Sequence, residues 1–85
     1  MNREEFKMFI ESIGFEYTVS LSNIERYDYK NYIIDLYQDH DVYQYHCDLC
    51  NGSIWTYGIK LNDLTLLQNK FKRELRSIKL KKLLL

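Results

Sequence analysis

A chain of 85 residues with twelve basic and twelve acidic side chains is long enough for one small domain, residues 1–85, with a single modest core. The charges are segregated, because residues 1–62 are net acidic and residues 63–85 are net basic. No apolar run is long enough to span a bilayer, and the N-terminus is too polar for a secretory signal, so we expect a cytoplasmic protein without a membrane partner.

The first predicted element is a helix that starts just after Asn2. Asn2 is a favourable N-cap residue, and Glu5, three positions later, can close a capping box. Apolar side chains recur at helical spacing from Phe6 to Ile13, and Gly14 then supplies a helix terminator. This N-terminal segment is therefore predicted to be an amphipathic α-helix that ends at Gly14.

Alternating apolar and polar side chains predict strands in the middle of the chain. The ranges with this alternation are 15–21, 31–37, 42–49 and 53–61. Residues 22–30 are predicted to be irregular, and residues 38–41 are predicted to form a turn. Short strands joined by tight turns favour antiparallel pairing.

The dipeptide Asn51-Gly52, between the last two of these ranges, is the strongest short-range signal of a β-hairpin. Burial should decide its register, because a shift of one residue exchanges the two faces of a strand. A three-residue loop that ends in a left-handed bulge at Gly52 turns the odd-numbered side chains inward. The predicted inward set is Tyr43, Tyr45, Cys47, Leu49, Trp55, Tyr57, Ile59 and Leu61.

A second, longer helix is predicted after a cap at Asn62 or Asp63. Its apolar residues from Leu64 to Ile78 fall within one narrow arc, and basic residues occupy most of the remaining surface. Leu66, Leu80 and Leu84 lie on the opposite side of this helix, and they either belong to a fraying end or form a self-association surface that would give a homodimer. The predicted fold class is α+β: a four-stranded antiparallel sheet, with three strands as the alternative, and the N-terminal and C-terminal helices packed on one face.

The two cysteines of the chain form a Cys-x-x-Cys pair, Cys47 and Cys50, beside the hairpin turn. A tight turn can present two thiolates to one tetrahedral ion, so a structural zinc ion (Zn) is a candidate cofactor, with His46 and His40 as candidate nitrogen ligands. The alternative is that Cys47 packs as a small apolar residue and Cys50 is a turn thiol. No orienting third group or pocket accompanies these residues, so we expect no enzymatic activity and no small-molecule substrate.

Two groups of charged residues are candidate partner-binding sites. The acidic group could dock onto a basic surface of a protein, and its members are Glu25, Asp28, Asp35, Asp39, Asp41 and Asp48. The basic group, on the last predicted helix, could contact phosphates of nucleic acid, and its members are Lys72, Arg73, Arg76 and Lys79.

In its length, its helix–sheet–helix order and its acidic group, the chain resembles small inhibitors of phages and mobile elements, in particular anti-CRISPR proteins that act on type II-A Cas9. The resemblance implies a stoichiometric, non-enzymatic inhibitor that works in a bacterial host cell. Its partner would be Cas9 or another nucleic-acid-processing enzyme, whose Arg- and Lys-rich groove receives the carboxylates. The alternative function is a small zinc-binding or nucleic-acid-binding regulator that uses the basic C-terminal helix.

Overall fold

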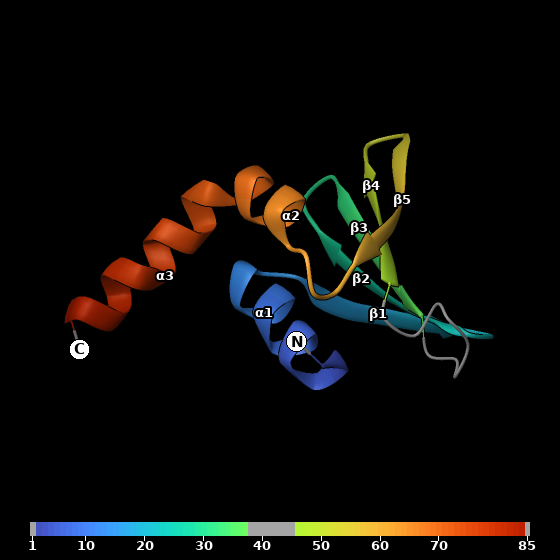
Figure 1. Cartoon of the computed structure of the whole chain (residues 1–85), viewed down its shortest axis with the longest axis horizontal. Coiled ribbons are helices and arrows are strands. Elements are labelled where there is room, and N and C mark those ends of the chain that lie inside the picture. Colours follow the sequence, from blue (N-terminus) through green and yellow to red (C-terminus); the bar gives the residue numbers. More distant parts are fainter. Residues whose placement is uncertain (1, 38–45, 85) are drawn as a thin grey trace.

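The computed structural model describes residues 2–37 and 46–84, and for residues 79–84 it describes the backbone alone (Figure 1). The elements are α1 (Arg3–Ile13), β1 (Glu16–Leu21), β2 (Ile24–Tyr29), β3 (Tyr32–Tyr37), β4 (His46–Asn51), β5 (Ile54–Lys60), α2 (Thr65–Lys70) and α3 (Lys72–Leu84). The strands form one antiparallel sheet in the order β1-β2-β3-β4-β5. The α+β class is confirmed, whereas the described residues form five strands and not the predicted four or three. The predicted turn at 38–41 and strand start at 42–45 lie outside these residues.

The unpredicted strand is β2, which covers most of the segment expected to be irregular. Its two flanking turns contain Ser22, with φ 45°, and Lys30, with φ 52°. Neither residue type is common in this left-handed conformation, so the turns left little signal in the sequence. The charged side chains of β2 also obscured its alternation: Arg26 bonds to Asp35 on one face while Tyr27 packs in the core on the other.

The hairpin of β4 and β5 differs from the prediction at its tip. Asn51 pairs with Ile54, so the loop consists of two residues, Gly52 and Ser53, instead of three. Gly52 has the predicted left-handed backbone, with φ 68°. The predicted bulge, however, lies further along β5 at Gly58, whose φ is 71° and around which the register of the pair shifts.

This bulge decides which face each side chain of β5 occupies. An extra residue in one strand reverses the facing of the side chains that follow it. Ile59 is therefore buried in the core together with Cys47, as predicted. The prediction that Trp55 and Tyr57 point inward is wrong, because both precede the bulge and lie on the opposite face, where Tyr57 is 71% exposed.

Helices α1 and α2 cover one face of the sheet (Figure 1). Helix α1 begins with the predicted capping box between Asn2 and Glu5 and ends at Gly14, whose φ is 130°. The core beneath the helices consists of Phe6, Ile10, Ile13, Phe15, Tyr27, Ile34, Leu36, Cys47, Leu49, Ile59, Leu61, Leu67 and Phe71. Each large apolar side chain buried here stabilises the fold by roughly 1.5–3 kcal/mol. The main core therefore lies between the helices and this face of the sheet.

The predicted C-terminal helix is divided into α2 and α3 by a break at Phe71, so the prediction of one continuous helix is wrong. The backbone of Phe71 has φ −113°, and its ring meets Phe15 and Tyr32 edge-on at centroid distances of 5.4 and 4.8 Å. This aromatic packing fixes the break inside the core. Beyond it Leu75 is only partly buried, and α3 extends away from the sheet (Figure 1).

Candidate functional site

The sheet face opposite α1 and α2 is not covered by any helix of the described residues, and we call it the open face (Figure 1). The pairing register, with the stacking of Tyr57 on Trp55, assigns to it Glu16, Val19, Leu21, Ile24, Arg26, Asp28, Ile33, Asp35, Tyr37, His46, Asp48, Cys50, Trp55, Tyr57 and Lys60. The side chains on a sheet face that meets solvent are usually polar. The apolar and aromatic members of the open face therefore distinguish it from an ordinary solvated surface.

An ion pair crosses the centre of the open face. Arg26 donates from Nε and Nη2 to the two carboxylate oxygens of Asp35, at 2.7 and 2.9 Å. This hydrogen bonding raises the pKa of Arg26 despite the opposing effect of its burial. Two parallel bonds also fix the orientation of both side chains, so the guanidinium is held in place on the sheet.

A second carboxylate, Asp48, lies directly opposite Asp35 across β3 and β4. Facing like charges are destabilising, so each carboxylate needs favourable contacts of its own. Oδ1 of Asp48 accepts the backbone N–H of Gly58 at 3.0 Å, and Oδ2 accepts the hydroxyl of Tyr37. The bulge at Gly58 thus provides a donor to a carboxylate that is only 5% exposed.

Trp55 and Arg26 together shield the middle of the open face. Arg26 is on β2 and Trp55 is on β5, yet the guanidinium carbon lies 6.0 Å from the indole centroid. Because β3 and β4 separate those strands, the two side chains must reach toward each other over the central strands. Their contact explains why Asp35 and Cys50 are buried although no described helix covers this face.

Tyr57 and two aliphatic residues give the open face its exposed apolar area. The ring of Tyr57 is stacked on Trp55 at a centroid distance of 6.0 Å and an angle of 13°. Val19 and Leu21, on the edge strand β1, are 40% and 42% exposed. Aromatic and aliphatic surface that is both exposed and held on strands is suited to burial against another macromolecule.

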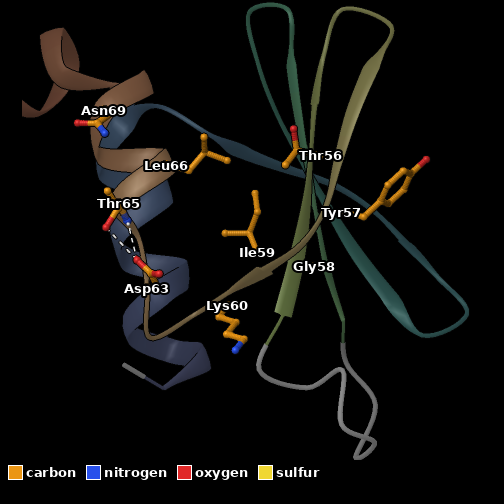
Figure 2. A pocket seen from close by; sticks show the side chains of 9 residues that line it. All are labelled: Thr56, Tyr57, Gly58, Ile59, Lys60, Asp63, Thr65, Leu66 and Asn69. Atoms are coloured by element: carbon orange, nitrogen blue, oxygen red, sulfur yellow. Dashed lines mark hydrogen bonds between the residues drawn. The ribbon is translucent and has the colours of Figure 1, made fainter.

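A shallow groove of about 590 Å³ lies between β5 and α2 (Figure 2). Ile59 and Leu66 point into the space between these elements, whereas the side chain of Tyr57 points away, toward the open face (Figure 2). Asp63 at the start of the α2 segment is engaged locally, since its Oδ1 accepts the hydroxyl of Thr65 at 2.9 Å. The groove adjoins the open face through β5 and extends the surface that a partner could cover.

The candidate zinc ligands do not come together within residues 2–37 and 46–84. Cys47 is in the core on the helix-covered face and Cys50 is on the open face, so the two sulfur atoms lie on opposite sides of β4. Burial raises the pKa of the Cys47 thiol to about 12, and the Cys50 thiol donates to the carbonyl of Gly52 at 3.3 Å. No group of three or more His, Cys, Asp and Glu side chains in these ranges could hold a metal, and His40 lies outside them. His46, which precedes Cys47 in the sequence, is half-buried. The zinc site stays a prediction.

The acidic candidates do not form one exposed patch in the described part of the chain. Its described members are Glu25, Asp28, Asp35 and Asp48, whereas Asp39 and Asp41 lie outside. Glu25 faces α1, where its Oε2 is 3.0 Å from Nζ of Lys7. Asp35 and Asp48 are the buried carboxylates of the open face, and Asp28 is exposed. Most of these described carboxylates are therefore engaged within the fold.

Three of the four basic candidates are described, and these three are exposed and lie apart from the open face. Lys72, Arg73 and Arg76 are exposed on α3, which projects from the body of the protein (Figure 1). The side chain of Lys79 lies outside the described residues. The structure thus presents three of these basic groups to solvent on a single helix.

Sequence reasoning missed the residues that distinguish the open face, namely Arg26, Trp55 and Tyr57. A usable signal existed at Gly58, because a glycine inside an alternating strand often marks a bulge. A bulge placed there assigns Trp55 and Tyr57 to the same face as Asp48. No comparable signal existed for Arg26, whose strand was not predicted.

No protein-family model matches the chain, and no curated protein or solved structure is detectably similar to it. None of the described helices is both long and apolar enough to cross a membrane.

Proposed function

We propose that the protein is a non-enzymatic, stoichiometric inhibitor that binds a protein target through its open face. The observation that carries this proposal is the stacked pair of Trp55 and Tyr57, with Tyr57 71% exposed, on a sheet face that no described helix covers. Aromatic residues and arginine are enriched among the residues that dominate protein–protein affinity. Burial of the Tyr57 ring by a partner would remove apolar surface from water.

The side chains of the open face are held in place by one another, and this order favours the binding of a partner. Arg26 is fixed by its bidentate bond to Asp35 and by its contact with Trp55, which in turn supports Tyr57. A partner would therefore meet side chains that are already ordered, so binding costs less conformational entropy.

The target we propose is a bacterial nucleic-acid-processing enzyme, and Cas9 is the specific candidate because of the resemblance to anti-CRISPR proteins. Such enzymes expose arginine and lysine side chains where they hold nucleic acid. The open face carries two exposed carboxylates, Glu16 and Asp28, as well as aromatic rings, and is complementary to a surface of that kind. Charge complementarity of this type speeds and orients association.

The test compares Tyr57→Ser with Met8→Ser in a titration of Cas9-catalysed DNA cleavage. Met8 is a matched control, because it is also a large exposed side chain (66%) but lies on α1. We expect Tyr57→Ser to weaken inhibition about tenfold or more, as for a residue that dominates an interface, and Met8→Ser to leave it nearly unchanged. Equal effects of the two variants would refute the role of the open face, and no inhibition by the parent protein would refute Cas9 as the target.

A second candidate function is nucleic-acid binding by α3, and it is favoured by the exposure of Lys72, Arg73 and Arg76 on a projecting helix. Contacts of these groups with phosphates would release counterions, so the affinity for duplex DNA or RNA would fall steeply as salt rises. A mobility-shift titration of the protein with each duplex at several salt concentrations tests this candidate.

A further inference from the structure

Trp55 contacts both a cation, Arg26, and a second aromatic ring, Tyr57, and we call these three residues the ladder. The guanidinium carbon of Arg26 is 6.0 Å from the centroid of Trp55, and the ring of Tyr57 lies nearly parallel to that of Trp55, also at 6.0 Å. Tyr57 is 71% exposed, so its ring is open to solvent. Because cations are attracted to the faces of aromatic rings, the Tyr57 ring can receive a second cation.

The charge of the open face also favours a cation at that position. Its described carboxylates are Glu16, Asp28, Asp35 and Asp48, against the cations Arg26 and Lys60. Asp48 lies next to the ladder, because it accepts the N–H of Gly58, the neighbour of Tyr57. The donors to Asp48, a tyrosine hydroxyl and a backbone amide, are neutral, so they satisfy its hydrogen bonds without cancelling its charge.

We propose that the open face binds an arginine side chain of its protein target, stacked on the outer face of Tyr57. This inference rests on the proposed function and specifies the chemistry of the partner at that surface. A guanidinium group is planar and weakly hydrated, so it stacks on an aromatic ring more readily than the compact, strongly hydrated ammonium of lysine. The target arginine would repeat, on the exposed ring of Tyr57, the contact that Arg26 makes with Trp55.

Charge argues against two other occupants of the same surface. A second copy that offered its own open face would bring together two surfaces with an excess of carboxylates, and nucleic acid would bring phosphates toward them. An arginine-bearing protein surface has the opposite sign and a side chain of matching shape. The inference therefore commits to a protein partner with an exposed arginine.

Trp55 is the only tryptophan of the chain, so its fluorescence reports directly on the ladder. The experiment titrates the full-length protein with a hexa-arginine peptide and, at equal ionic strength, with a hexalysine peptide. We expect hexa-arginine to change the Trp55 emission and to bind about fivefold more tightly than hexalysine. We expect Tyr57→Leu to weaken hexa-arginine binding by roughly 3–10-fold, and Tyr57→Phe, which keeps the ring, to retain it.

Equal affinity for the two peptides, or an unchanged affinity in Tyr57→Leu, would overturn the inference. If Tyr57→Ser abolishes inhibition of the target while hexa-arginine does not bind, the proposed function stands and the arginine inference fails. If Tyr57→Ser leaves inhibition unchanged, the proposed function itself fails. Sedimentation equilibrium is the second measurement: a monomer is expected, and a dimer that Tyr57→Ser dissociates would overturn the assignment of this surface to a target protein.

Discussion

Arg26 compensates the charge of the buried Asp35 carboxylate on the open face. In Arg26→Met the carboxylate, 5% exposed, would lose both of its bonds to the guanidinium. We expect the free energy of unfolding to fall by about 2 kcal/mol, less than for a fully buried pair, because the side chain of Arg26 is 31% exposed. Urea unfolding followed by far-UV circular dichroism measures this change without relying on the fluorescence of Trp55.

The double variant Arg26→Met/Asp35→Leu is the control for this prediction. Replacement of a buried ion pair by apolar groups of similar size is often nearly neutral, so the second substitution should recover most of the lost stability. A single Arg26→Met variant as stable as the parent protein would show that the ion pair does not compensate the burial of Asp35.

The buried thiol of Cys47 predicts a loss of stability at alkaline pH. Burial raises its pKa from 9.0 to about 12, so the thiol is neutral in the folded protein and ionises near pH 9 when the chain unfolds. Above pH 9 the unfolded state binds fewer protons, and the stability present below pH 9 decreases toward pH 12. The contribution of Cys47 to this decrease is at most about 1.4 kcal/mol per pH unit, measured as urea unfolding between pH 8 and pH 11.

Cys47→Ala should show a shallower decline over the same pH range, and below pH 9 it should be less stable than the parent protein because a buried atom has been removed. Some slope should remain in this variant, because burial also raises the pKa of Tyr27 and acts in the same direction. Identical slopes for the variant and the parent protein would exclude Cys47 as a source of the pH dependence.

At the scale of elements, the end of α1 depends on the absence of a side chain at Gly14. A Cβ atom added there would lie 2.7 Å from Cε1 of Tyr29, and the φ of 130° is unfavourable for any L-residue with a side chain. We expect Gly14→Ala to lower the free energy of unfolding by roughly 2–4 kcal/mol, from backbone strain and overpacking together. Gly52→Ala, with φ 68° and no atom within 4 Å, should cost only about 1 kcal/mol. Equal losses in parallel urea titrations would show that Tyr29 does not constrain this position.

The elements that could be predicted are those whose signals are local. Helix α1 was predicted from Asn2 to Gly14, because its cap, its apolar spacing and its terminator all lie within one stretch of sequence. Strand β2 was not predicted, because its turns use Ser22 and Lys30 and its charged residues have partners on other elements. The break at Phe71 likewise depends on rings that are distant in the sequence.

The open face could be predicted less well than the fold that carries it. Its central contact joins Arg26 on β2 to Trp55 on β5, two strands that are not neighbours in the sheet. Its exposed ring, Tyr57, depends on a bulge that was predicted at Gly52 and lies at Gly58. The alternation of apolar and polar residues divides the side chains of a strand into two sets but does not say which set is buried along its whole length. A single extra residue in a bulge exchanges the two sets beyond it.

At the scale of the whole molecule, the charge segregation of the sequence becomes a separation in space. The protein is elongated, with extents of 41 × 27 × 22 Å, and α3 projects away from the sheet that carries the open face (Figure 1). A sheet face with an exposed aromatic ring and a basic helix therefore meet solvent at different ends. Since charges farther apart than about 10 Å are largely screened at physiological salt, each end can contact a partner independently of the other.

This separation allows the two candidate functions to be distinguished with one variant. Reversal of the charges of Lys72, Arg73 and Arg76 to glutamate should leave the fold intact, because all three side chains are exposed. If the open face binds the target, we expect inhibition within about twofold of the parent protein, since surface changes away from an interface have small effects. The measurement pairs the cleavage titration with a mobility shift on duplex DNA.

Nucleic-acid binding by α3 predicts the opposite result for this charge-reversal variant. If α3 holds nucleic acid, the variant should lose both inhibition and duplex binding, and the slope of log affinity against log salt should become shallower by about 3, one unit for each phosphate contact removed. Tyr57→Ser would then leave both activities unchanged, because Tyr57 lies on the open face and not on α3. The two variants thus predict opposite outcomes under the two functions, and a protein that responds to both must use both ends in one complex.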